Sequence, residues 1–588
     1  MMKNAKKWTI IALLLIVLGA FFVRTHNFNS WLYFKMDQAR DAFLIDNIAE
    51  NGPGYMPLLG ARAGATEVEK GFLRLGPIFY YFQYFSTLIF NSTQPPVMAY
   101  PDLFFSMAAI VLLYFFARLY FSRKYSLMIT AMYAFSFIII QYSRFAWNPN
   151  SLQFFILLSF YGLLRFFKEE NSRKRYLWLT LWISGIVIGS QLHFFGFFGL
   201  VGISGLFVLI KLKVWKKEKL ISYFSKKNLG NFSKYAAVVI LIFAILYSPV
   251  IISDIKEGGQ NTRNFIAALS SKAEKKPITK KISKNFSENI NYYCLITTSQ
   301  CYGDESKADS LAMFLTAIIL LSGIALAARE IRREKNSGRK DFLMLFLIWI
   351  ATYFFLMIPF SFQLRPRFFI VVFAIPFVCL GLIYEFFEKN LDRKKAVQAA
   401  SIVTALIVGW NAYGTYAWFS EQGNSQKEAT EIRRSLILKA KDGVLLWHLQ
   451  NAADWIYTHH EKGKTLYYYV KPEHIRPMDY LLYKKGDKDL VVETMKINED
   501  PNAEYFAITP TKNGLEPVTK KFGDKITLLE QKTFGQITVS KILLNDRSIS
   551  ANFRFNKSKT KTDRLFWKDV FNEKENDDNK LKNITGEE

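Results

Sequence analysis

The sequence lacks several features that would point to other classes of protein. The pair His459-His460 has no partner at metal-ligand spacing, so we interpret it as a surface pair and not as a zinc site. No A-x-A-like cleavage site follows the basic residues Lys3, Lys6 and Lys7 and the apolar run behind them. This excludes a cleaved signal peptide and favours an uncleaved first helix. The chain also has no internal repeat of the kind that many transporters carry.

Cysteine is also rare, with three residues in 588. Cys294 and Cys301 fall in a long polar segment, 254–310, whereas Cys379 lies inside an apolar run. A disulfide between the first two would suit an oxidising exterior. Two free thiols are the alternative that the sequence leaves open.

Long apolar runs are the dominant feature of the chain. The runs 8–23, 236–253, 342–359 and 396–418 are close to the ~20 residues that a helix needs to cross ~30 Å of hydrocarbon. Mean hydropathy stays near zero only because polar loops and a charged tail dilute these runs. We therefore predict a multi-spanning α-helical membrane protein with about eleven transmembrane helices, followed by a soluble C-terminal α/β domain.

The formal net charge of +27 is concentrated in short loops between apolar segments. This placement fits the positive-inside rule better than a nucleic-acid footprint, so we expect no nucleic-acid partner. The basic loops are 118–124, 165–175, 211–227, 329–340 and 389–395. All of them can be cytoplasmic together with the N-terminus. The segments then placed outside are 24–75, 143–150, 191–196, 254–310, 361–367 and everything after about 419.

Two apolar segments conflict with this topology. The segments 75–90 and 103–120 cannot both cross the membrane if the N-terminus and residue 118 share a side. One of them must be re-entrant, interfacial or partly inserted. We expect this to be 75–90, which carries Gln83 and several aromatic residues near its start.

The composition divides the chain into a membrane domain, 1–419, an outer α/β domain, 420–556, and a charged tail, 557–588, predicted to be disordered. In the outer domain we predict helices at 444–461 and 478–483, strands at 465–470 and 505–509, and a hairpin over 525–544 that turns at Gly535.

The first outer loop holds the most informative acidic residue. Asp37 opens a short helical pattern that stops at Asn51-Gly52-Pro53. In one interpretation Asp37 is a helix N-cap, and Asp41 and Asp46 form a solvated face. In the other, Asp37 is a general base at the membrane surface.

This arrangement resembles the GT-C superfamily of lipid-dependent glycosyltransferases, particularly the bacterial relatives of protein O-mannosyltransferases and the aminoarabinose transferase. Those enzymes carry an acidic motif, commonly Asp-Glu, in the loop after the first span, and the corresponding pair here is Asp37-Gln38. The likeness extends over about residues 1–420. Its other segments are KGFLRLGPIFYYFQYF (70–85), QYSRFAWNPN (141–150), SDIKEGGQNTRNF (253–265) and QLRPRFFIVVFAIPF (363–377).

The resemblance implies an inverting, mannosyltransferase-like enzyme that moves a sugar from a polyprenyl-phosphate-linked donor to an extracytoplasmic protein, lipid or envelope glycan. Asp37 would be the catalytic base. Gln38 replaces the usual second acid, which argues against a divalent cation unless Asp41 joins Asp37 as a ligand. The leaving phosphate needs cations, and the candidates are Arg365, Arg367, Arg144, His193, Lys70 and Arg74. For each of them, an interfacial residue that contacts lipid headgroups is the alternative.

Two further functions stay open at this point. A transporter or flippase for lipid-linked saccharides would place polar residues in the centres of several spans, whereas most ionisable residues here avoid them. A non-catalytic membrane scaffold would use the outer domain to bind a partner. In all three cases we expect a multi-pass cell-membrane protein with a cytoplasmic N-terminus and an extracytoplasmic C-terminal domain.

Overall fold

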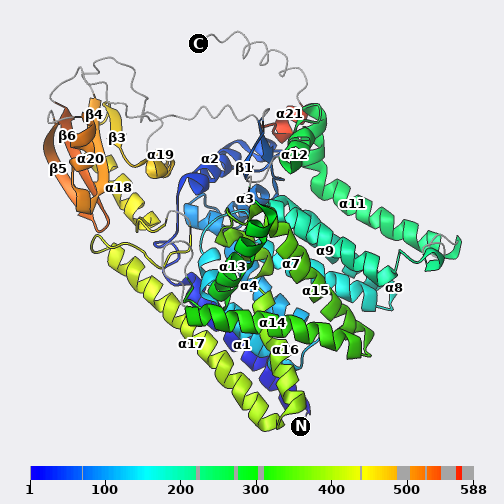
Figure 1. Cartoon of the computed structure of the whole chain (residues 1–588). Coiled ribbons are helices and arrows are strands. Elements are labelled where there is room, and N and C mark those ends of the chain that lie inside the picture. Colours follow the sequence, from blue (N-terminus) through cyan, green and yellow to red (C-terminus); the bar gives the residue numbers. More distant parts are fainter. Residues whose placement is uncertain are drawn as a thin grey trace.

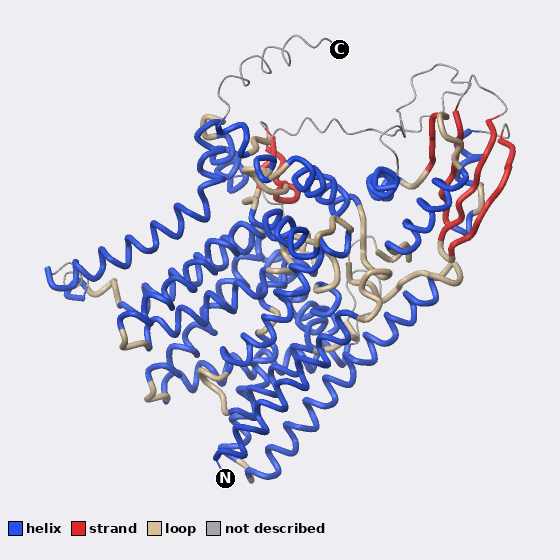
Figure 2. The backbone as a smooth tube through the Cα atoms, turned by 180° about the vertical axis from the view of Figure 1, so that it is seen from behind, coloured by secondary structure: helices blue, strands red, loops and turns tan. Residues whose placement is uncertain are grey.

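A bundle of long helices and a smaller domain with a β-sheet make up the molecule (Figure 1). The long helix α17 (Arg393–Ser425) leaves the bundle and leads directly into the smaller domain, whose strands stand apart from the bundle (Figure 2). The computed structural model describes residues 2–68, 71–219, 226–270, 276–301, 310–437, 440–485, 503–522, 526–544 and 564–571.

The bundle confirms the predicted multi-spanning architecture. Within the described ranges, seven helices are long and apolar enough to cross a membrane, or eight if the bent pair Pro366–Val372 and Ile375–Asn390 is one span. The seven are α1 (Met2–Thr25), α4 (Pro95–Ala117), α9 (Phe194–Leu212), α11 (Lys226–Lys256), α14 (Ser310–Arg333), α15 (Ser337–Met357) and α17. The bent pair is η3 and α16. The expected number of about eleven is reached when three shorter or more polar elements of the same bundle are counted: α5 (Arg123–Ala134) with α6 (Phe137–Tyr142), α7 (Leu152–Lys168) and α8 (Ser172–Leu192).

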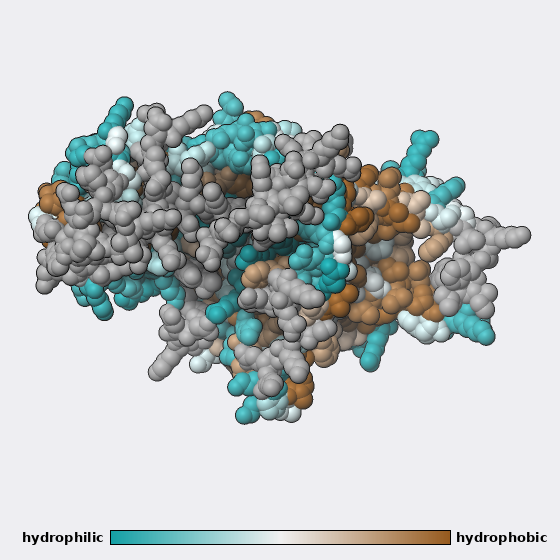
Figure 3. Space-filling model, turned by 90° about the horizontal axis from the view of Figure 1, so that it is seen from above, coloured by the Kyte–Doolittle hydropathy of each residue, from teal (hydrophilic) through white to brown (hydrophobic). Residues whose placement is uncertain are grey.

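Apolar side chains cover the outside of the bundle, as lipid contact requires. On α11, Ile240, Leu241 and Phe243 are all exposed. Seen from above, hydrophobic side chains gather on the side of the molecule away from the sheet domain, whereas hydrophilic ones line a hollow near the centre (Figure 3). Exposed apolar surface of this extent is stable in hydrocarbon and not in water.

The basic segments meet at one end of the bundle. Lys124 Nζ lies 2.5 Å from a carboxylate oxygen of Glu388, and Arg339 Nη2 lies 2.5 Å from one of Glu385. The N-terminus and the start of α17 lie at the same end (Figure 1). The fold therefore brings together the loops that we predict to be cytoplasmic, and the side of the membrane on which they lie stays a prediction.

The doubtful segment 75–90 forms the short helix α3 (Ile78–Phe90) of 13 residues. At 1.5 Å per residue such a helix covers about 20 Å, which is less than the ~30 Å hydrocarbon core. It ends at Asn91 in the left-handed conformation. Its buried Gln83 donates a hydrogen bond to the Met98 carbonyl on α4, 3.3 Å away. The length of α3 thus agrees with the expectation that this segment does not cross the membrane.

Cys294 and Cys301 form a disulfide, which resolves the two alternatives left by the sequence. Both are fully buried at the end of α13 (Ile278–Thr297), outside the spanning helices, and Cys379 is a buried free thiol.

We expect the double substitution Cys294→Ser/Cys301→Ser to lower the free energy of unfolding. The bridge closes a loop with a sequence separation of 7, for which chain entropy predicts a loss of about 2–3 kcal/mol. The measurement is the thermal unfolding midpoint of the purified protein in detergent. Cys379→Ser is the control, because it removes a buried thiol without breaking a bridge. An equal midpoint for both variants would contradict the prediction.

The C-terminal domain is a four-stranded mixed sheet with helices packed against it. The strand order is β3-β4-β6-β5, in which β3 and β4 run parallel and the other pairs are antiparallel. The elements are α18 (Leu446–His459), β3 (Thr465–Tyr469), η4 (Pro472–His474), α19 (Ile475–Lys485), β4 (Ala503–Pro510), η5 (Thr511–Asn513), α20 (Glu516–Phe522), β5 (Ile526–Phe534) and β6 (Ile537–Leu544). The predicted helices, strands and hairpin are confirmed. Gly535 has φ +50° in the hairpin turn, and a Cβ there would lie 2.1 Å from the Ser425 carbonyl oxygen.

The predicted disorder of the tail is wrong for residues 564–571. Phe566 forms a β-bridge with Pro57, and the Leu58 amide donates to the Leu565 carbonyl at 2.9 Å. Residues Trp567–Phe571 then form helix α21. The prediction of disorder came from the polar composition of the tail as a whole, whereas residues 564–571 (RLFWKDVF) are mostly apolar and pair with a distant loop that the sequence does not reveal. The rest of the tail lies outside the described residues.

Candidate active site

The predicted outer elements cover the end of the bundle opposite the basic loops (Figure 1). Helix α2 runs from Met36 to Asn51 and ends at Gly52, as predicted. The remaining outer elements are η1 (Pro53–Tyr55), β1 (Arg62–Val68), β2 (Gly71–Arg74) and α12 (Gln260–Ser270).

Asp37 lies in the first turn of α2, with Lys35 as the N-cap residue, so the N-cap interpretation of Asp37 is wrong. Its side chain is 54% exposed and accepts a hydrogen bond from Arg40 Nη1 at 3.0 Å. An accessible carboxylate on a short rigid helix is suited to receive a proton from an incoming hydroxyl.

Asp41 and Asp46 do not form a solvated face, because both are buried at 2% exposure. Asp41 accepts hydrogen bonds from Arg40, and from Tyr80 at 3.1 Å, while Asp46 pairs with Lys484 of the C-terminal domain at 2.8 Å. Burial raises the pKa of Asp41, and the charge of Arg40 offsets part of that rise. These two carboxylates hold α2 in place and do not face substrate.

Gln38 links α2 to a second outer loop. Its amide nitrogen donates to the Ala146 carbonyl at 3.0 Å, and its oxygen accepts from the Lys35 backbone amide at 3.2 Å. The side chain is buried with both ends engaged. Gln38 therefore positions the helix that carries Asp37.

Arg367 lies within electrostatic range of Asp37, although 330 positions separate them in the sequence. The two charges are close enough to interact, and the Arg367 guanidinium stacks over the Trp147 ring with its carbon 5.3 Å from the centroid. Arg365 precedes it at the start of η3 and is exposed. The first, second and late outer segments thus meet around one carboxylate and one guanidinium.

His193 lies between α8 and α9, within electrostatic range of Arg367. Its ring packs near Phe195 and Phe368, and Nδ1 accepts from the Phe195 amide at 3.2 Å. Burial, followed by the charge of Arg367, lowers the pKa of His193 to about 3. The ring is therefore neutral at physiological pH and offers a hydrogen bond, not a charge, to a phosphate.

Arg144 does not belong to this cluster, which corrects the expectation that it binds donor phosphate. It is 3% exposed and donates to the Val23, Arg24 and His26 carbonyls at 2.7–3.1 Å. A cation at a helix C-terminus satisfies carbonyls that have no partner in the helix. Arg144 therefore caps α1.

The two remaining cation candidates lie away from Asp37 or outside the described chain. Arg74 ends β2, where its backbone amide donates to Asn261 of α12 at 3.0 Å. Lys70 lies outside the described residues.

Two sets of acidic groups are candidates for a metal ion, the pair Asp37 and Asp41 from the sequence and a second set whose spacing suits an ion. Between Asp37 and Asp41 lies the Arg40 guanidinium, which bonds to both carboxylates. The second set is Asp442, Glu473 and His474, whose ligand atoms lie within 4.8 Å of one another. The Lys35 ammonium lies 2.5 Å from Asp442 and 3.2 Å from His474 Nε2. In both places a protein cation takes the position between the ligands, so neither donor set fits a metal ion as it stands.

The C-terminal domain is bonded to the segment that leads into α2 by two backbone hydrogen bonds and one ion pair. Two backbone amides in the first turn of α18 donate hydrogen bonds to this segment. The Leu446 amide donates to the Leu32 carbonyl at 3.0 Å, and the Trp447 amide donates to the Ser30 carbonyl at 3.1 Å. Three residues later Lys35 pairs with Asp442. The bonds from His474 and Lys35 outweigh burial and hold the pKa of Asp442 well below its usual range, so it is ionised.

Sequence reasoning missed Arg40, Lys35 and Asp102. Asp102 is fully buried in α4 and accepts from the Trp147 amide at 2.8 Å and the Ser151 hydroxyl at 2.5 Å. It thereby fixes the loop that carries Trp147. An acidic residue inside an apolar helix is the signal that could have identified it.

Comparisons with known proteins agree with this geometry. Residues 6–252 match the family model of dolichyl-phosphate-mannose-protein mannosyltransferase. ArnT from Cupriavidus metallidurans bound to undecaprenyl phosphate aligns with a TM-score of 0.51 at 12% identity, over 91% of this chain and 98% of that one. The oligosaccharyltransferase of Archaeoglobus fulgidus in the apo form aligns with a TM-score of 0.49 at 12% identity, over 88% of this chain and 73% of that one. No protein of curated function matches the sequence.

The family match covers the segments that carry Asp37, Trp147 and His193, and the ArnT likeness covers nearly the whole fold. The chain therefore has the fold of ArnT, and its residues 6–252 are similar to the dolichyl-phosphate-mannose-protein mannosyltransferase family.

Proposed function

We propose that this protein transfers a sugar from a polyprenyl-phosphate donor to an acceptor on the extracytoplasmic side of the membrane, with Asp37 as the base. The observation that carries the proposal is that Asp37 and Arg367 lie within electrostatic range of each other, on segments that the loop carrying Ala146 and Trp147 joins. The Asp37 carboxylate is suited to accept a proton and the Arg367 guanidinium to stabilise a leaving phosphate, and a glycosyl transfer requires both.

The proposed reaction is a single displacement. The Asp37 carboxylate takes the proton of the acceptor hydroxyl while the acceptor oxygen bonds to C1 of the sugar. The bond between C1 and the phosphate oxygen breaks, and the polyprenyl phosphate leaves with the electron pair. Arg367, with Arg365 beside it, stabilises the new negative charge, and His193 donates a hydrogen bond from Nε2 to the same group, because its Nδ1 already accepts from the Phe195 amide. One displacement inverts the anomeric centre.

The proposed membrane orientation follows from the same cluster. Asp37, Arg367 and the C-terminal domain share one end of the bundle, and the basic loops share the other. With the basic end in the cytoplasm, the site faces the exterior, where the sugar of a lipid-linked donor is presented to its acceptor.

The test of this function is a transfer assay with purified protein in membrane extract. A panel of polyprenyl-phosphate sugars serves as donors, with the mannosyl lipid first because of the family match, and mass spectrometry identifies glycosylated products. A product carrying the donor sugar with an inverted anomeric centre supports the proposal. Donor hydrolysis or transfer with retention would refute it.

We further propose that the C-terminal domain positions the catalytic helix through Lys35. We expect Lys35→Met to lower kcat about tenfold with little change in the donor KM, because it releases the start of α2 but touches no substrate. Lys35→Arg, which keeps the cation opposite Asp442, should recover most of the rate. Lys464→Met, a surface lysine of the same domain, is the control. A loss confined to KM, or no recovery by arginine, would contradict this role.

A further inference from the structure

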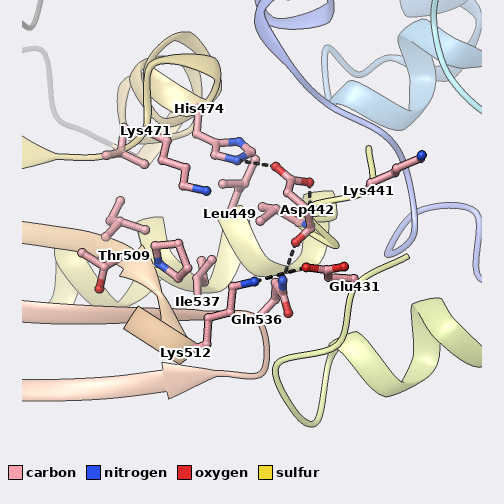
Figure 4. A pocket seen from close by; sticks show the side chains of 14 residues that line it. Glu431, Lys441, Asp442, Leu449, Lys471, His474, Thr509, Lys512, Gln536 and Ile537 are labelled. Atoms are coloured by element: carbon pink, nitrogen blue, oxygen red, sulfur yellow. Dashed lines mark hydrogen bonds and ion pairs between the residues drawn. The ribbon is translucent and has the colours of Figure 1, made fainter. Parts of the chain in front are cut away.

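A cavity of about 340 Å³ lies within the C-terminal domain, away from the Asp37–Arg367 cluster. It opens where the parallel strands β3 and β4 end, since Val470 follows β3 and Pro510 closes β4. Leu449 of α18 and Ile537 of β6 add apolar walls (Figure 4). The carboxyl ends of neighbouring parallel strands are a common place for ligands, and this volume suits a sugar-sized group.

Two lysines bring positive charge to the cavity. Lys471 extends toward Leu449 and Asp442, and Lys512 approaches from the opposite wall (Figure 4). In the part of the chain that the structure describes, the Lys471 ammonium has no hydrogen bond or ion pair. Lys512 pairs with Glu431 at 3.2 Å, but both side chains are more than half exposed, so this pair is weak.

The acidic group at the base of the cavity is already neutralised. Asp442 pairs with Lys35 and with His474, and its backbone carbonyl accepts a hydrogen bond from Gln536. His474 and Gln536 are themselves buried. The base of the cavity is therefore a fixed network. The other charged lining residues are Lys441, Lys471, Lys512 and Glu431, so the lysines outnumber the remaining carboxylate.

We propose that this cavity binds a small anionic group of the acceptor, a carboxylate or a phosphate, through Lys471 and Lys512. Ammonium groups bind both kinds of anion as point charges. An occupant would lie against Asp442, which pairs with Lys35. Lys35 is two residues before Asp37, so an acceptor bound here would lie next to the catalytic helix. The inference rests on the proposed function, because it specifies the acceptor of that reaction.

The test is a binding titration of the full-length protein in nanodiscs, followed by ligand-observed NMR. The probes are methyl glucuronide for a carboxylate source, glycerol phosphate for a phosphate source, and methyl glucoside as a neutral sugar. We expect at least one anion to bind more tightly than the glucoside. Lys471→Met/Lys512→Met should weaken that binding about tenfold.

The matched control is Lys462→Met/Lys464→Met, which removes the same charge at the opposite end of β3 and should bind as the wild type does. Equal binding of glucoside and anions, no binding of either anion, or equal losses in the two double variants would overturn the proposal. Asp37→Asn separates it from the proposed function, because that variant should lose transfer and keep anion binding. If the wild-type protein transferred the sugar but bound neither anion, this inference would fail and the proposed function would stand.

Discussion

Asp37→Asn is expected to lower kcat by about 10²–10⁴, because general-base catalysis contributes that much when a positioned group accepts the proton. The amide keeps the size of the side chain and its hydrogen bond from Arg40, so the helix and the donor affinity should change little. The measurement is transfer to the acceptor at saturating donor, with donor binding followed separately.

Asp454→Asn is the matched control for this experiment. It removes one half-exposed carboxylate from α18, where Asp454 pairs with Lys485 at the surface. Wild-type kcat in Asp37→Asn, with correctly folded protein, would remove Asp37 from the mechanism. Equal losses of kcat in both variants would mean that the rate depends on the net negative charge of the protein and not on proton transfer to Asp37.

Arg367→Gln is expected to lower kcat/KM by about 10²–10³, because one preorganised cation on a developing anion has an effect of that size. The guanidinium packs against the Trp147 ring and interacts with the charge of Asp37; glutamine can still pack at this position but cannot neutralise a phosphate. The measurement is the donor dependence of the transfer rate.

Arg393→Gln is the control for the arginine, because it removes an exposed guanidinium at the opposite end of the bundle. The two experiments also separate the roles of the residues. Asp37→Asn should act on kcat, whereas Arg367→Gln should raise the KM of the donor as well. Unchanged donor kinetics in Arg367→Gln would exclude this arginine from the phosphate site.

The local elements were predictable because their signals are local. Helix α2 ends at Gly52 because a glycine there adopts φ +91°, and the hairpin turns at Gly535 for the same reason. Strand and helix periodicity likewise marked β3 and α18. The membrane domain was predictable because a helix in hydrocarbon must satisfy its own backbone, which requires long apolar runs.

The roles of the polar residues were only partly predictable. Arg144 and Arg367 are both arginines in outer segments, yet one caps α1 and the other faces Asp37. Their sequence neighbours do not distinguish them, because each role depends on which distant backbone or side chain lies within hydrogen-bond reach. The same holds for residues 564–571, an apolar segment within a charged tail, whose β-bridge to Pro57 depends on a distant part of the chain.

The sequence by itself determined that this is a membrane protein with an acidic residue after its first span, and with basic loops that can share one side. The length of hydrophobic runs and the placement of charged residues are properties of the chain. They determine membrane insertion and orientation without reference to how the helices pack. Only the tertiary structure decided that Lys35 pairs with Asp442, 407 positions away, and that Asp37 meets Arg367. Such contacts form between groups that the fold brings together, so their energies depend on distance and burial and not on sequence order.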